Sequence, residues 1–295
     1  MTGRSAATLV GFTAVLMWAL LALMSAASGS VPPFQLAAMT FLIGGLMGAV
    51  TWPFRKGAVA ALWQGWQVWL LGVAGLFGYH FVYFSAIRAA PAVEVSLIAY
   101  LWPLFLVVFS AFLPGERLKL HHLAGVALGL AGAAIIITGG QGLSLSNGLE
   151  TGHLLAFACS LIWSGYSVLS RRFGDVSTDA VAGFCLATAF LSAICHVTFE
   201  TTVWPADALQ WAAVLGLGLL PVGAAFYTWD YGVKHGDIMV LGAASYASPL
   251  LSTLVLVAAG FAPFTWPVLA ACLLITAGAV IAAWDMLFRR GPPVT

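Results

Sequence analysis

The residues best suited to bind a small molecule lie in residues 79–103, YHFVYFSAIRAAPAVEVSLIAYLWP. Tyr79 and Tyr83 are four positions apart and would share one face of a helix, with His80 beside them. The returning segment adds Tyr100, Trp102 and Pro103. Phenols and indoles offer both a ring face and an O–H or N–H donor. These residue types can contact a small molecule through both ring faces and hydrogen bonds.

A second stretch, AFYTWDYGVKHGDIMVLGAASYASP (225–249), repeats the first at an offset of 146 residues. The offset places Pro249 on Pro103, and at 145 it places Trp163 on Trp18. Each copy reads as a helix out to one membrane face, a polar turn, and a return helix with a proline. The repeat predicts a transport path built from two halves.

Composition requires the elements that carry these residues to lie in a membrane. The chain is 62% hydrophobic and 7% charged, with a mean hydropathy of +1.01. A soluble domain needs far more charge on its surface. We therefore expect an all-α membrane protein with ten transmembrane helices, each near ~20 residues. Their predicted limits are 6–25, 34–53, 66–88, 93–113, 121–138, 152–171, 180–199, 208–232, 238–259 and 267–287.

The basic residues predict the orientation. With a cytoplasmic N-terminus, every Lys and Arg except Arg88 falls on the cytoplasmic side, so both termini should be inside. Residues 139–150, rich in Gly, Ser and Asn, should form an external linker. Five helices on each side of it predict two inverted five-helix repeats, 1–138 and 151–295.

Depth along each helix, at ~1.5 Å per residue, brings the candidate residues to one level. The residues expected near the bilayer centre are Trp18, Tyr79, His80, Pro103, Trp163, Pro221 and Pro249. Single rings there face lipid more often than a cavity. Several phenols and indoles on consecutive helices favour a cavity, because each O–H or N–H needs a partner in hydrocarbon.

His80 is the ionisable residue expected nearest the bilayer centre, which marks it as a functional candidate. The alternative is a neutral histidine satisfied by a tyrosine hydroxyl or a backbone carbonyl. We expect His80 to act by hydrogen bonding rather than by charge. Asp230 should pair with Lys234 at i+4, which leaves no central carboxylate and argues against strict proton coupling.

Pro103 and Pro249 are predicted hinges, because each removes a backbone hydrogen bond in mid-helix. Ser245 and Ser248 should help to satisfy the carbonyl freed by Pro249 and line the binding site with it. The alternative is a static kink that only improves packing.

The sequence lacks the residues that other classes of protein require. No nucleophile and base pair or metal-ligand set is evident, so we expect no enzyme, no cofactor and no metal. No span carries the polar stripe of an open channel. A net charge of +1 gives no basic face for nucleic acid. The expected partners are the lipid bilayer and a small-molecule substrate. The oligomeric state stays open, with a monomer compatible.

The chain resembles the drug/metabolite transporter superfamily in its ten spans, its Trp in spans one and six, its Pro in spans four and nine, and its LPGERL after span four. The stretch YHFVYFSAIRAAPAVEVSLIAYLWPL resembles the aromatic amino acid exporters of its EamA-type branch. One departure is Phe261-Ala262 in place of a second copy of Gly115-Glu116.

The resemblance implies a multi-pass exporter of Phe, Trp and Tyr in the bacterial inner (plasma) membrane. Export would proceed by alternating access through a central cavity. Other small amphipathic metabolites or cationic drugs are alternative substrates. A sugar-phosphate exchanger is disfavoured, because Arg88 and Lys234 would lie at opposite faces. Energy coupling and the face open at rest stay undetermined.

The predicted topology is testable at the linker. A single cysteine at Ser146 should react with an impermeant maleimide added outside intact cells, because ten spans place 139–150 outside. Labelling from the cytoplasmic side alone would contradict the orientation.

Overall fold

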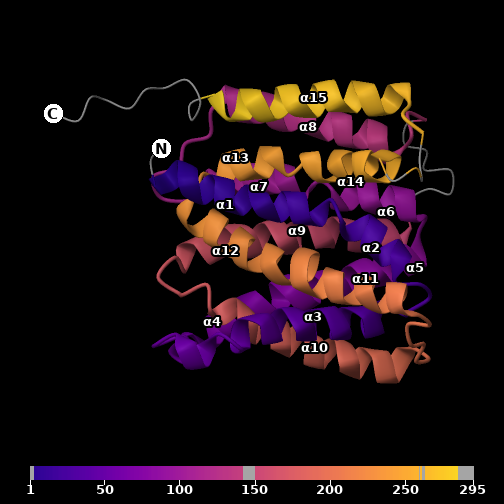
Figure 1. Cartoon of the computed structure of the whole chain (residues 1–295). Helices are drawn as coiled ribbons and strands as arrows, with labels where there is room; N and C mark the ends of the chain where they lie inside the picture. The colour runs from indigo at the N-terminus through magenta and orange to yellow at the C-terminus, as the bar shows by residue number, and fades with distance from the viewer. Residues whose placement is uncertain (1–2, 142–149, 259, 261–262, 285–295) are drawn as a thin grey trace.

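Helices form throughout the apolar segments, because a chain in hydrocarbon must satisfy each N–H and C=O internally. The computed structural model describes residues 3–141, 150–258, 260 and 263–284, and within these ranges no strand is present. The helices lie side by side in one bundle (Figure 1). α1 (Gly3–Trp18) begins at the same end of the bundle at which α15 (Trp266–Ala282) finishes (Figure 1).

The remaining elements complete the bundle. They are α2 (Leu21–Ala27), α3 (Pro33–Ala49), η1 (Trp52–Phe54), η2 (Val59–Leu62), α4 (Trp66–Val73), η3 (Ala74–Gly78), α5 (Tyr79–Ala89), α6 (Ala92–Ala99), α7 (Trp102–Ser110), α8 (Leu120–Ile137), α9 (Thr151–Arg172), α10 (Ala180–Phe199), α11 (Ala208–Leu219), η4 (Leu220–Ala224), α12 (Ala225–His235), α13 (Ile238–Ala244) and α14 (Ala247–Ala258).

All ten predicted segments contain helix. Eight described stretches are long and apolar enough to cross a membrane: Gly3–Ala27, Pro33–Phe54, Trp66–Ala89, Leu120–Ile137, Thr151–Arg172, Ala180–Phe199, Ala208–His235 and Ile238–Ala258. Two shorter apolar stretches, Glu94–Ser110 and Trp266–Ala282, stand at the fourth and tenth predicted segments. The fourth segment is shorter than predicted, because α7 ends at Ser110 and a turn follows it. The predicted tenth extends past residue 284, outside the described residues.

Several segments are interrupted near their middles. The third and eighth each contain a π-helical turn, η3 and η4, and these turns start 146 residues apart, which is the offset of the sequence repeat. π-turns inside α-helices are frequent at functional sites. The first, fourth and ninth break between α1 and α2, α6 and α7, and α13 and α14.

The prolines explain the breaks in the fourth and ninth segments. Pro103 is the second residue of α7 and Pro249 the third of α14, so each lies just after a break. Without a proline N–H, the Ser245 carbonyl instead accepts the Ser248 backbone N–H at 3.0 Å. A hinge role for either proline stays a prediction.

The helices before and after residues 139–150 pack against each other across the bundle. α1 lies on α12, α5 on α9, α3 on α10, α7 on α13 and α8 on α15. The α8–α15 and α3–α10 pairs occupy opposite edges (Figure 1). Exchanging each helix for its repeat counterpart turns α1–α12 into α5–α9 and leaves α3–α10 and α8–α15 unchanged. The two halves are therefore interleaved, and neither forms a separate bundle.

Glycines permit the closest of these pairings. A Cβ on Gly232 would lie 2.4 Å from the Gly11 Cα, where α12 crosses α1. A Cβ on Gly125 would lie 2.5 Å from the Gly278 carbonyl oxygen, where α8 crosses α15. Small residues let helix backbones approach this closely in lipid. Gly125, Gly129 and Gly132 of α8 serve this packing, since a Cβ on them would meet Gly278, Tyr246 and Ile275 respectively.

We expect Gly232→Ala to destabilise the protein by roughly 1–3 kcal/mol, because its methyl group would meet backbone rather than a side chain that can move. Gly165→Ala in α9 is the matched control, since a Cβ there meets nothing within 4 Å and helix propensity improves by up to ~1 kcal/mol. Thermal unfolding in detergent measures both. Equal midpoints for the two variants would contradict the close-packing role.

Candidate solute-binding cavity

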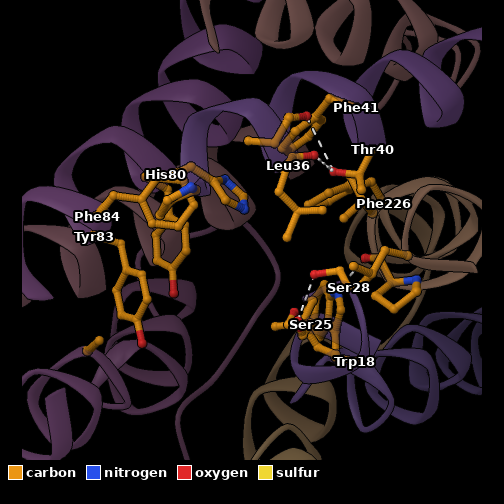
Figure 2. A pocket seen from close by; sticks show the side chains of 18 of the residues that line it. Trp18, Ser25, Ser28, Leu36, Thr40, Phe41, His80, Tyr83, Phe84 and Phe226 are labelled. Carbon is orange, nitrogen blue, oxygen red and sulfur yellow. Dashed lines mark hydrogen bonds between the residues drawn. The ribbon is translucent and has the colours of Figure 1, made fainter. Parts of the chain in front are cut away.

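A cavity of about 440 Å³ lies among the interrupted helices. Its walls come from α1–α2, α3, α5, α6–α7, α9, α11–α12 with η4, and α14. Eight of the eleven predicted site residues line it: Trp18, Tyr79, His80, Tyr83, Tyr100, Trp102, Trp163 and Ser248. Figure 2 shows side chains facing the cavity from opposite walls. Residues from both halves of the chain thus meet around one space.

The other three predicted residues lie outside this lining. Pro103 and Pro249 are buried at the starts of α7 and α14. Ser245 is fully buried and its Oγ donates to the Leu241 carbonyl oxygen at 2.7 Å. A binding role for these three stays a prediction, and their observed position is at the helix breaks behind the wall.

Sequence reasoning missed part of the lining. The residues expected near the bilayer centre include none from the second span, yet Thr40 and Phe41 of α3 line the cavity. Ser25 and Ser28 line it beyond the break in the first span. Phe226 was within reach, because the offset of 146 makes it the repeat counterpart of His80. The offset gives no such signal for Thr40, since its counterpart is Leu186.

Four tryptophans close one end of the cavity. The Trp18 ring centroid is 5.8 Å from that of Trp163 and 6.4 Å from that of Trp102. Trp229 lies behind these rings, fully buried, 5.1 Å from Trp18 and 5.7 Å from Trp102. Ring contacts of this kind contribute ~0.5–1.5 kcal/mol per pair beyond burial. The four rings form a layer across the bundle, which we call the tryptophan layer.

Hydrogen bonds fix the orientation of two of these indoles. Trp18 Nε1 donates to the Pro221 carbonyl oxygen in the η4 π-turn at 3.0 Å. Trp229 Nε1 donates to Ser167 Oγ of α9 at 3.0 Å. The Trp18 bond attaches this indole to the backbone of a π-turn. The interrupted helices therefore help to hold the tryptophan layer in place.

A network of charges ties the helix ends together beyond the tryptophan layer. Glu116 accepts from Arg4 at 2.9 Å and from Arg171 at 2.6 Å, and its side chain is 8% exposed. Arg4 also lies 3.3 Å from Asp237, and Arg171 donates to the Gly236 carbonyl at 2.7 Å. Charge-assisted bonds that converge on one partly buried carboxylate are stronger than isolated surface pairs. We call these residues the ion network.

The opposite end of the cavity is open. Its lining reaches Gly29, which is exposed in the turn between α2 and α3. Glu200 there accepts the backbone N–H groups of Phe34 and Gln35 at the start of α3, at 3.0 and 3.1 Å. Its carboxylate also pairs with Arg88 at 3.2 Å. The buried Glu200 carboxylate thus accepts the free N–H groups at the start of α3, beside the open end of the cavity.

None of the described residues that line the cavity is an Asp, Glu, Lys or Arg, and His80 is the one histidine among them. His80 Nδ1 lies 2.7 Å from the Leu76 carbonyl oxygen, which is one of the two partners expected for a neutral histidine. The expected Asp230–Lys234 pair is present at 2.9 Å and lies outside the lining. A second i,i+4 pair that the sequence predicts, Asp285 with Arg289, lies outside the described residues. Binding here must rely on ring faces and neutral dipoles.

A helical membrane bundle of interleaved repeats around one neutral cavity has the architecture of a transporter. The EamA-like transporter family matches residues 5–138 and again residues 150–284, and the chain belongs to this family. It is therefore a multi-pass membrane protein of a transporter family.

Two named relatives are exporters. The chain is 54% identical to the aromatic amino acid exporter YddG of Ancylobacter novellus, over 88% of this chain and 90% of the relative. It is 25% identical to the exporter of the same name from Escherichia coli, over 85% and 87% of the two chains. A crystal structure with 54% sequence identity superposes with a TM-score of 0.90, covering 95% of this chain and 97% of that one.

The ion network should keep the bundle closed beyond the tryptophan layer, so Glu116→Gln should open it. The probe is Ser167→Cys, buried behind Trp229, in a background without the four native cysteines. Maleimide labelling in detergent should speed up several-fold in the Glu116→Gln protein, because a neutral amide holds two arginines more weakly.

Asp179→Asn is the matched control, since it removes the ion pair between Arg55, which follows η1, and Asp179 at the start of α10, and leaves the network intact. Equal labelling rates in the Glu116→Gln and Asp179→Asn proteins would show that the network does not hold this end closed.

Proposed function

We propose that this protein exports aromatic amino acids, with Phe, Trp and Tyr as substrates. The observation that carries the proposal is the neutral, ring-walled cavity between the two halves of the chain. Its volume of about 440 Å³ falls in the range of small-molecule pockets. A substrate ring gains contact with tryptophan and tyrosine faces, and its polar end meets hydroxyl, imidazole and backbone dipoles. The names of the relatives support the same substrate class.

We infer that all ten apolar segments cross the membrane, with both termini in the cytoplasm. The shorter fourth and tenth segments are included because each packs against a long neighbour within the bundle. Inverted repeats at 1–138 and 151–295, joined by an external linker at 139–150, are supported by the twofold family match. The π-turns 146 residues apart support them as well. A bacterial inner membrane is the proposed location.

With this orientation the described conformation is open to the outside. The exposed Gly29 end of the cavity faces outward, while the tryptophan layer and the ion network face the cytoplasm. Loading from the cytoplasm then requires Arg4 and Arg171 to separate from Glu116 and the tryptophan layer to part. The breaks at α1–α2, α6–α7 and α13–α14 are the sites where we expect the helices to bend. Alternating access follows from these two closures.

Trp102→Ala and Trp163→Ala should each lower Phe uptake by proteoliposomes, by roughly three- to tenfold at subsaturating Phe. The reason is that the bound Phe loses ring contacts in each variant. The control is Trp66→Ala at the start of α4, since Trp66 is 69% exposed and lies away from the cavity. It should leave transport per folded molecule unchanged.

Parent rates of Phe transport in both cavity variants, at parent expression, would show that the cavity is not the binding site. Uptake of a cationic dye but not of Phe by the parent protein would favour the alternative substrate class.

A further inference from the structure

We propose that the substrate's ammonium group binds between His80 on α5 and the wall formed by Thr40 and Ser28. These three side chains present hydrogen-bond acceptors, and no donors, to the cavity. The assignment rests on the proposed function, because it concerns how an amino acid is held in the same cavity. It fixes the direction in which the amino acid lies.

The tautomer of His80 follows from its partner. The Leu76 carbonyl oxygen, 2.7 Å from Nδ1, can only accept a hydrogen bond, so Nδ1 carries the proton. In a neutral imidazole the other nitrogen, Nε2, then holds a lone pair and no proton. His80 contacts the rings of Phe41, Tyr79, Phe84 and Phe226, and no described lining residue is an acid that would stabilise the charged form. His80 is therefore an acceptor toward the cavity.

On the facing wall, the hydroxyl protons of Thr40 and Ser28 are already donated to backbone carbonyls. Thr40 Oγ1 donates to the Leu36 carbonyl at 2.8 Å and approaches the Ala37 carbonyl at 3.3 Å. Ser28 Oγ donates to the Ser25 carbonyl at 2.7 Å. Each hydroxyl has one proton, so what remains for the cavity is an oxygen lone pair. Both side chains line the cavity although Thr40 is only 2% and Ser28 only 1% exposed.

The two walls face each other across the cavity, His80 on one side and Thr40 and Ser28 on the other (Figure 2). A primary ammonium carries three N–H donors and no acceptor, which complements three acceptors. Phe41 and Phe226, whose rings stack on each other 5.5 Å apart, line the same space and offer no hydrogen-bond donor. A carboxylate placed there would meet lone pairs, which repel it, and no proton donor.

Proton donors remain on the tyrosine side. Tyr83 Oη and Ser96 Oγ lie 3.3 Å apart, and since one of them donates to the other, the pair keeps one proton to offer. The Tyr79 and Tyr100 phenols also line the cavity. A carboxylate is satisfied by these donors. The amino acid therefore lies with its ammonium toward Thr40 and Ser28 and its carboxylate toward the tyrosines.

The test compares L-Phe with two analogues that each lack one charged group. 2-Phenylethylamine keeps the ammonium, and 3-phenylpropionate keeps the carboxylate. Binding to the purified full-length protein in lipid nanodiscs is measured by calorimetry for the parent, Thr40→Val and His80→Phe. Thr40→Val keeps the shape of the side chain, His80→Phe keeps a flat ring, and each removes the acceptor. Because a hydrogen bond to a charged group is lost, each should weaken L-Phe and 2-phenylethylamine roughly tenfold.

Two further variants separate loss of the acceptor from loss of folding. His80→Gln keeps an acceptor oxygen and should retain most of the affinity for L-Phe. Thr198→Val, whose hydroxyl likewise donates to the carbonyl four residues earlier but on the exposed face of α10, should change no affinity. Binding of 3-phenylpropionate should be equal in parent, Thr40→Val and Thr198→Val.

A Thr40→Val protein that binds 3-phenylpropionate more weakly but 2-phenylethylamine as the parent does would overturn the assignment. A parent protein that fails to bind 2-phenylethylamine would overturn it too. If the parent binds 2-phenylethylamine through Thr40 but does not bind L-Phe, the proposed function falls and the ammonium site stands.

Discussion

Hydrocarbon cannot hydrogen-bond to a peptide group, and the rest of this structure depends on that constraint. At two of the interruptions in its helices, another group of the chain hydrogen-bonds to a backbone carbonyl. The Trp18 indole does so for the Pro221 carbonyl, and the Ser248 backbone N–H does so for the Ser245 carbonyl. These breaks and π-turns occur on the helices that surround the cavity. The backbone irregularity and the binding space are thus two results of one constraint.

The interleaving of the halves determines what can move. Each described pair of α1–α12, α5–α9, α3–α10, α7–α13 and α8–α15 crosses from one half to the other. At α1–α12 and α8–α15, backbone lies against backbone at Gly11–Gly232 and Gly125–Gly278, so these interfaces resist sliding. We therefore expect bending at the breaks to be the less costly motion. We also expect the ion network to control the opening of its end of the bundle, because it joins the ends of α1, α7, α9 and α12 through one carboxylate.

The described lining carries no acidic, lysine or arginine side chain, which favours rapid release of a bound solute over tight binding. A zwitterion held by a buried ion pair would leave slowly, because breaking the pair would strand a charge in a low-dielectric site. Each contact with a ring face or a neutral dipole contributes a smaller binding free energy, and water can replace such contacts easily. In the proposed assignment, acceptors on one wall and donors on the other still orient the substrate. Orientation would then be achieved without tight binding.

The sequence by itself determined the helices and most of the ring-bearing wall. Hydropathy requires membrane helices, and the offset of 146 pairs Trp229 with Tyr83 and Phe226 with His80. Only the tertiary structure decided the ion network, since Arg4 and Glu116 are 112 residues apart and no periodicity links them. It alone placed Thr40 and Ser28 on the cavity and committed their protons to backbone carbonyls. The physical reason is that hydropathy and repeats report how apolar each segment is, whereas a hydrogen bond depends on which atoms folding brings within 3 Å.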